Sequence, residues 1–515
     1  MGGFVRRETS KTTLLPVPCV GSNEGLCQTV FYESHEVSRP FYKDNTTENT
    51  RRSRALFSRG FKRRGGRRRG RGATLGLLVL GVVASAWISA PRAAARQAQA
   101  ESSKSAEAQT TQPPPDRYEL TPGERARAIA YSHRQYAVYF GGVVFTSLIF
   151  LFLWRSGIAR TLRDWACRAS SKLVVQCLIF VTLFLAAVAL LEWPLEFYSG
   201  FVLERRFGLS RESFALWMRD WSVGLGLNLF GGFFVIWVLY FLIRRAPRAW
   251  WIYLWMATVP IALAVILIHP LVIDPLFYKF TPLAASEPQL AARMERMVRR
   301  ADLDIPEARI FLMNASSKTR VVNAYVTGLG ASKRIVVWDT ALDKLGADET
   351  LLMVGHEAGH YVLDHIPKEF VLIELAFPLF IYLGFRLSGW VVGRWGAVSG
   401  VEGLGDLASA PILLLILTGL LFFASPVICG ISRHFEHQAD QFGLELAHGV
   451  VRDPNAAEVH SLQVMGEEDL EDPEPSPFIK FWLYTHPPLE ERIEFAAHYK
   501  PWAEGKPLEL LRPDH

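Results

Sequence analysis

The chain has 515 residues, enough for several average soluble domains, but its composition argues against a soluble protein. Half of the residues are hydrophobic and 21% are charged, whereas soluble domains carry about 25% charged residues. The net charge of +6 comes from the N-terminus, because residues 1–72 hold 16 basic and 6 acidic side chains and the remainder holds 40 and 44. A basic tail is not the basic surface of a nucleic-acid-binding domain, so we expect no nucleic acid partner. The composition predicts an integral membrane protein.

The N-terminal 130 residues are predicted to precede the folded domains. Residues 1–72 are basic and lack apolar periodicity, so a disordered extension is expected. Residues 73–100 begin with an uncharged run after the basic segment and end in small residues with an A-x-A pattern. This arrangement is typical of a cleaved signal peptide, with a membrane anchor helix as the alternative. Residues 101–130 are predicted to be a linker.

Six further apolar runs are long enough to cross a bilayer as helices. Four form a predicted N-terminal membrane domain, residues 131–273, and two lie within residues 370–432; the runs are 135–154, 173–191, 222–243, 251–273, 370–392 and 407–432. Glu374 and Arg386 lie in the fifth run, facing either a polar interior or the membrane surface. The predicted fold class is mainly α: a polytopic α-helical membrane protein with six core spans plus an N-terminal signal or anchor helix.

Two polar segments, residues 274–369 and 433–515, are predicted to form one small α+β domain that the last two spans interrupt. β-rich apolar pieces at 308–313, 321–326 and 334–338 predict a small sheet. Helices are expected at 289–301, 348–364 and 435–447.

The strongest chemical signal is His356-Glu357-Ala358-Gly359-His360. On a helix, His356 and His360 project from one face and can hold one metal ion, while Glu357 can act on a water molecule at that ion. Apolar flanks argue against the alternative, a surface helix with two solvated imidazoles. The five cysteines are scattered without a C-x-x-C pair, so a thiolate site is not expected. The pattern predicts a zinc hydrolase.

A zinc site of this kind needs a third protein ligand. On a helix directly after the last span, Glu436 and Asp440 share a face, so Glu436 can bind the metal while Asp440 orients a ligand or donates a proton. His434 and His437 are rival ligands, and a polar interfacial helix without metal is the alternative to all of them. His365 is predicted to support the site or the fold rather than to bind metal.

Six motifs together resemble the integral-membrane zinc endopeptidases typified by the type I CAAX prenyl protease, with the heat-shock membrane proteases as more distant relatives. They are DPLFYKFTPL at 274–283, NAY at 323–325, KRIVVWDT at 333–340, GHEAGH at 355–360, SRHFEHQAD at 432–440 and THPPLEER at 485–492. The resemblance runs from about Tyr131 to Lys500. It implies a zincin-like catalytic domain and one Zn²⁺ per chain.

The resemblance also implies roles for individual residues. The implied zinc ligands are His356, His360 and Glu436, with Glu357 as general base. Asp440 matches the acidic residue commonly assigned as proton donor, and His486 matches a histidine thought to steady the oxyanion. Asn323 and Ala324 match the edge strand that binds extended substrate.

The expected function is a multi-pass, zinc-dependent endopeptidase acting on peptides or membrane-associated proteins, lipidated ones included, in contact with membrane lipid. A quality-control protease of the heat-shock type is the first alternative and a non-catalytic zinc-binding scaffold the second. A scaffold has no need of Glu357, which argues against it. The resemblance implies a cytosolic site, whereas the basic loop 155–172 and Arg244, Arg245 and Arg248 favour an extracytoplasmic one.

Overall fold

The computed structural model describes residues 117–328 and 332–511. The predicted extension at 1–72 and the signal or anchor helix at 73–100 lie outside the described residues. Within them, six helical segments are long and apolar enough to cross a membrane, as predicted. They are α3 (Pro122–Arg155), α5 (Leu173–Phe197) with α6 (Glu204–Phe207), α7 (Phe214–Arg245), α8 (Trp250–Ile268) with α9 (Asp274–Phe277), α13 (His365–Ser399) and α14 (Ala410–Ala447).

The first membrane helix, α3, begins at Pro122, inside the segment 101–130 that was predicted to be a linker. A capping box explains the early start. The side chain of Thr121 accepts a hydrogen bond from the backbone of Glu124, and the Glu124 carboxylate accepts one from the backbone of Thr121. The polar composition after this cap concealed a helix that continues into the membrane.

The last membrane helix, α14, is one continuous helix, although we predicted a span at 407–432 and a separate helix at 435–447. The change from apolar to polar residues after Ser432 therefore marks the point where the helix leaves the apolar region, not where it ends. Glu436 and Asp440 are consequently carried by the same helix that crosses the membrane.

Helix α4 (Ile158–Ala169) connects α3 and α5 at the end of the bundle far from the polar domain. Arg163 in α4 forms an ion pair with Asp406, which lies in the turn between α13 and α14. Trp154 at the end of α3 donates a hydrogen bond to Ser399 at the end of α13, with an Nε1–Oγ distance of 2.6 Å. The membrane helices are thus tied together at this end.

The polar domain contains a four-stranded sheet in the order β1-β2-β4-β3, with β3 at one edge. Its strands are β1 (Phe280–Pro282), β2 (Ile310–Met313), β3 (Ala324–Thr327) and β4 (Arg334–Trp338). β2 and β4 are parallel, and the two outer pairs are antiparallel. The predicted strand at 334–338 is confirmed; β3 lies further along the chain than predicted, and β1 was not predicted because its three residues include a proline.

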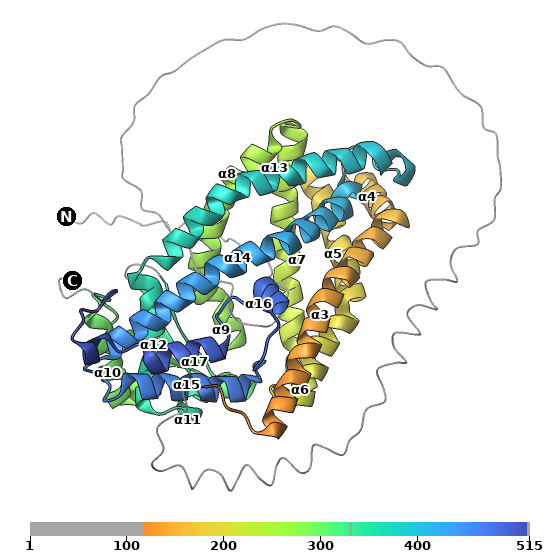
Figure 1. Ribbon diagram of the computed structural model, residues 1–515. Coiled ribbons are helices and arrows are strands. Elements are labelled where there is room, and N and C mark those ends of the chain that lie inside the picture. The colour runs from red at the N-terminus through yellow and green to blue at the C-terminus, as the bar shows by residue number, and fades with distance from the viewer. Residues whose placement is uncertain (1–116, 329–331, 512–515) are drawn as a thin grey trace, which may run out of the picture. The chain divides into compact units, whose positions relative to one another are not determined.

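Helices α10 (Pro288–Arg299), α11 (Asp339–Lys344), α12 (Ala347–Val362), α15 (Pro454–Asp469), α16 (Pro477–Leu483) and α17 (Leu489–His498) complete the domain. Figure 1 shows α10, α12, α15 and α17 gathered at one end of α14. Buried apolar side chains of these helices and of the sheet form one core, which includes Met294, Ile335, Leu351 and Ile493.

Glycines let α12 and α14 approach each other closely. A Cβ atom added to Gly443 of α14 would lie 2.9 Å from the backbone nitrogen of His356, closer than van der Waals contact permits. A Cβ atom added to Gly359 would lie 3.2 Å from the side chain of Phe442. This close packing holds the histidines of α12 beside the carboxylates of α14.

Candidate metal centre

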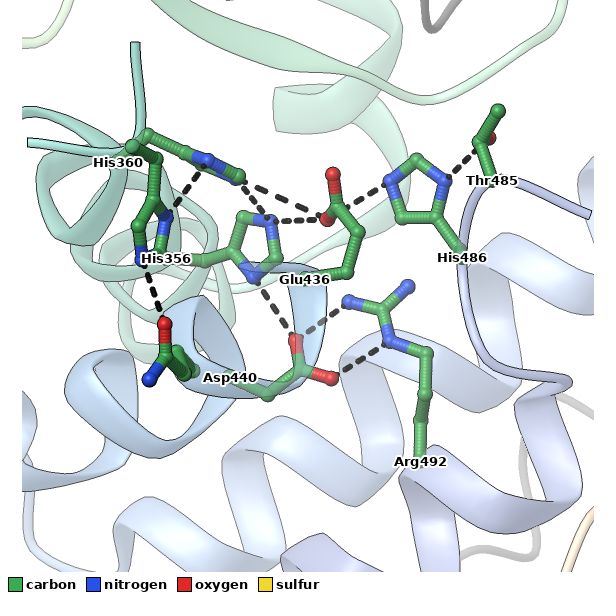
Figure 2. Close-up of polar contacts among 9 residues, drawn as sticks. His356, His360, Glu436, Asp440, Thr485, His486 and Arg492 are labelled. Atoms are coloured by element: carbon green, nitrogen blue, oxygen red, sulfur yellow. Dashed lines mark hydrogen bonds and ion pairs between the residues drawn. The ribbon is translucent and has the colours of Figure 1, made fainter. Parts of the chain in front are cut away.

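Two imidazoles of α12 and one carboxylate of α14 meet at the predicted centre (Figure 2). The Nε2 atoms of His356 and His360 are 3.3 Å apart. One Glu436 oxygen, Oε2, lies 3.2 Å from Nε2 of His356 and 3.7 Å from Nε2 of His360. The three predicted metal ligands are therefore brought together, although His356 and Glu436 are 80 residues apart in the sequence.

The donor set fits a divalent cation. Glu436 Oε2 is buried, and within the described residues it has no hydrogen bond of good geometry, even though imidazole nitrogens surround it. A buried carboxylate oxygen without such a bond is costly unless a cation satisfies it. Burial alone would lower the pKa of His356, but the Asp440 and Glu436 carboxylates raise it to about 10, which shows how strongly this position favours positive charge. Two imidazoles and a carboxylate are ligands that zinc accepts.

A third imidazole lies at the same centre. His486, in the segment after α16, has its Nε2 atom 3.0 Å from Glu436 Oε2, and its Nδ1 atom lies 3.1 Å from the Thr485 hydroxyl. The ligand atoms of His356, Glu436 and His486 all lie within 4.8 Å of one another. His486 is therefore placed either to bind the metal or to meet a substrate there.

Asp440 lies behind His356 rather than at the open side of the centre. Its Oδ1 atom is 2.8 Å from Nδ1 of His356, and its two oxygens accept hydrogen bonds from Arg492 at 2.7 and 2.9 Å. Burial would lower the pKa of Arg492, but the Asp440 carboxylate raises it above its ordinary value. Asp440 is thus a buried, ion-paired carboxylate that fixes the ring of His356, and sequence reasoning had assigned no role to Arg492.

His360 has a comparable support. The Nδ1 atoms of His360 and His365 are 3.2 Å apart, and Nε2 of His365 is 3.1 Å from the side-chain oxygen of Gln438. His365 is buried and stacks on Phe435. It supports the predicted ligand, in line with the sequence interpretation. Gln438 was missed because an amide two residues after Glu436 has no signature of its own.

The rival ligands His434 and His437 lie elsewhere. Both are exposed on α14, and the ring of His437 packs against Phe495. Glu357 is half-buried on α12 next to His356. Burial raises the pKa of Tyr361, and the negative charge of Glu357 adds to this shift.

The two predicted substrate-binding residues lie at the start of the edge strand. Ala324 pairs with Val337 of β4, and its side chain is buried. The carbonyl oxygen of Asn323 accepts a hydrogen bond from the backbone of Trp338. β3 packs against α12, the helix of the histidines. Any contact of Ala324 with a substrate would use its main chain.

Comparison with known proteins gives the family. Residues 284–500 match the model of peptidase family M48, and residues 104–279 match the model described as CAAX prenyl protease N-terminal, five membrane helices. The metalloprotease YhfN of Bacillus subtilis is 33% identical over 380 residues, which are 73% of this chain and 86% of that protein. The chain belongs to peptidase family M48.

Other members extend the comparison. The CAAX prenyl protease 1 homolog of Arabidopsis thaliana is 30% identical over 314 residues, covering 59% of this chain and 69% of that protein. The crystal structure of S. mikatae Ste24p has the same fold, with a TM-score of 0.64 at 24% identity over 76% of this chain and 93% of the other. This M48 peptidase is an integral, multi-pass membrane metalloprotease that hydrolyses peptide bonds, and the expected family is confirmed.

Proposed function

We propose that this M48 peptidase is a zinc endopeptidase in which His356, His360 and Glu436 hold one Zn²⁺. The observation that carries the proposal is the position of Glu436 Oε2. This buried oxygen faces the Nε2 atoms of both histidines, and in the described part of the chain it has no hydrogen bond of good geometry. When bound, zinc acts as a Lewis acid that polarises the scissile carbonyl group and increases the acidity of water.

The protein's own groups supply the remaining chemistry. Glu357 takes a proton from the attacking water and transfers it to the leaving amine. His486 donates a hydrogen bond from Nε2 to the oxyanion that develops on the scissile carbonyl, and Thr485 orients its ring through Nδ1. Asp440, held by Arg492, keeps His356 in the tautomer whose Nε2 lone pair faces the metal. This assigns Asp440 the orienting role, not that of a proton donor.

We further propose that the substrate is recognised mainly through its backbone. An extended segment of a peptide or membrane-associated protein would lie along the edge strand β3, beginning at Asn323 and Ala324. Main-chain pairing tolerates many side chains and makes no use of a lipid, so we expect cleavage of unmodified peptides as well as prenylated ones. The relatives named CAAX prenyl proteases motivate the comparison of prenylated and unmodified substrates.

The purified full chain tests these proposals. Cleavage products of one peptide, with and without a prenyl group, would be mapped by mass spectrometry before and after chelation. We expect cleavage of both forms, loss of activity with a chelator and recovery with zinc. Activity that survives complete metal removal would reject the zinc mechanism, and strict dependence on the prenyl group would reject backbone recognition.

We also propose that the metal centre lies on the extracytoplasmic side. Basic residues of α4 and of the turn between α7 and α8 lie at the end of the bundle far from the polar domain, and positive charge favours the cytoplasm. Cys167 on α4 is exposed and reports on this end, whereas Cys177 and Cys429 are buried. A membrane-impermeant maleimide applied to intact cells should label the wild type and Cys167→Ser to the same extent. Additional labelling of the wild type at Cys167 would contradict the proposed orientation.

A further inference from the structure

A hollow of about 310 Å³ lies beside the metal centre, on the outer side of α14. α14, α16 and α17 meet there, and its lining is rich in cations and imidazoles: Arg433, His434, His437, Lys480, Pro487, Glu491 and Arg492. The metal ligands and Glu357 do not line it. The hollow therefore adjoins the peptidase centre, through Arg492 and Pro487, but does not contain its metal ligands.

Positive charge in the hollow is only partly neutralised. Arg492 forms an ion pair with Asp440, and the Lys480 ammonium group is 2.7 Å from a carboxylate oxygen of Glu491. Arg433 donates hydrogen bonds to the carbonyl oxygens of Lys480 and Tyr484, and within the described residues no carboxylate forms an ion pair with it. An unneutralised guanidinium group beside an ammonium group and two imidazoles is suited to an anion, phosphate above all.

The position of the hollow indicates where the anion comes from. Phe423 and Val427 form an exposed apolar stripe on α14, with 71% and 65% of each residue accessible. His434 is seven residues beyond Val427, nearly two turns, so it continues the same stripe about 10 Å further along the helix. The surface of α14 thus changes from apolar side chains to imidazole and guanidinium groups over the distance between acyl chains and headgroups.

Helix α16 extends the apolar surface sideways. Phe478 and Phe481 are exposed, while Trp482 lies on Phe422 of α14 with ring centroids 4.8 Å apart. Phe478 stacks at 5.8 Å on Phe140 of the membrane helix α3. Figure 1 shows α16 between α14 and α3. The aromatic face of α16 is therefore continuous with the surface of the membrane helices, and Lys480 of the same helix reaches the hollow.

We propose that this hollow binds the phosphate headgroup of an acidic phospholipid of the surrounding bilayer. The phosphate lies among Arg433, His434 and Lys480, and the acyl chains lie along Phe423, Val427 and the exposed phenylalanines of α16. Basic pockets at the membrane surface of helical proteins bind anionic headgroups in this way. Because α16 leads directly into His486, an occupied hollow holds that segment in place beside the metal centre.

The test uses the delipidated full chain in detergent, titrated with phosphatidylglycerol or with phosphatidylcholine of the same acyl chains. Native mass spectrometry counts the bound lipid. We expect phosphatidylglycerol to bind at least ten-fold more tightly, and millimolar inorganic phosphate to displace it poorly. Equal binding of both lipids would overturn the proposal. Full displacement by inorganic phosphate would overturn it as well, because the hollow would then be a site for a soluble anion.

Variants connect binding to the hollow. The pair His434→Glu with Lys480→Gln adds a negative charge to the hollow and removes the ammonium group, and it should weaken phosphatidylglycerol binding at least ten-fold. Lys500→Glu, on an exposed residue just after α17, should leave binding unchanged. Glu491→Gln should instead tighten binding several-fold, which keeps the proposal testable if the double variant folds poorly. The proposal fails if Lys500→Glu weakens binding as much as the pair does, or if Glu491→Gln weakens it.

Discussion

Replacing Asp440 by asparagine separates the two roles that its position in the sequence allows. The asparagine is nearly isosteric, but it removes the charge that pairs with Arg492 and replaces one carboxylate oxygen with an amide nitrogen. The carboxylate accepts hydrogen bonds from Arg492 at 2.7 and 2.9 Å and lies 2.8 Å from Nδ1 of His356. Asp440→Asn therefore loosens His356 and leaves a buried guanidinium group without its counter-ion.

Two effects of different size follow. Loss of a partner that orients a metal-binding histidine costs about 10- to 100-fold in metal affinity, or about 1.4 to 2.7 kcal/mol. Breaking a buried ion pair from one side costs about 3 to 5 kcal/mol of stability. Asp406 offers a matched control, because it is also a shielded carboxylate paired with an arginine, Arg163, but at the far end of the bundle. Asp406→Asn should lower stability without changing metal affinity.

The assay is a zinc titration against a competing chelator, combined with thermal unfolding of the metal-free proteins. Asp440→Asn should show weaker zinc binding and a lower melting temperature, with activity recovering as zinc is raised to saturation. The orienting role is refuted if Asp440→Asn binds zinc as tightly as the wild type and yet stays inactive at saturation. That result would support the alternative role of Asp440, which is to donate a proton during the reaction.

Three further predictions concern neighbouring groups. Glu357→Gln should retain zinc and lose about 10²- to 10⁴-fold in kcat, measured with a fluorogenic peptide; unchanged cleavage would exclude Glu357 as the base. His486→Ala should lower kcat by about 10²- to 10³-fold while the zinc content of the purified protein stays at one per chain, and loss of zinc would show that His486 is a ligand. Glu458 is buried, and burial together with the charge of Asp440 raises its pKa to about 7. The folded protein therefore binds this proton more tightly than the unfolded chain does. As a result, the folded state loses stability as the pH rises from the ordinary pKa of a glutamate towards 7. The melting temperature of Glu458→Gln should therefore fall less than that of the wild type between pH 5 and pH 8, and parallel curves would contradict the assignment.

The membrane helices and the HExxH helix were predictable because their signals are local. Long apolar runs and a pair of histidines four residues apart need no knowledge of the rest of the chain. Glu436 is different, since spacing alone left it in competition with His434 and His437, and only the family motifs singled it out. The packing of α12 against α14 at Gly443 gives the physical reason, because Glu436 faces the histidines while its two rivals are exposed.

The supporting groups were harder to predict because they depend on contacts between distant segments. Arg492 reaches Asp440 across 52 residues, and no spacing rule marks it as a partner. The boundary expected after Ser432 was misplaced for a physical reason: hydropathy reports the solvent around a helix, whereas backbone hydrogen bonds decide where the helix ends. The same distinction explains the early start of α3 at Pro122.

Because α14 is unbroken, the transmembrane portion of this enzyme supplies part of the metal centre itself and does not only anchor it to the membrane. A helix of 38 residues is about 57 Å long, longer than the hydrocarbon core of a bilayer is thick, so its last turns extend beyond the apolar region and carry the Glu436 carboxylate to α12. Cutting the chain after Ser432 to obtain a soluble fragment would sever the same helix just before that carboxylate.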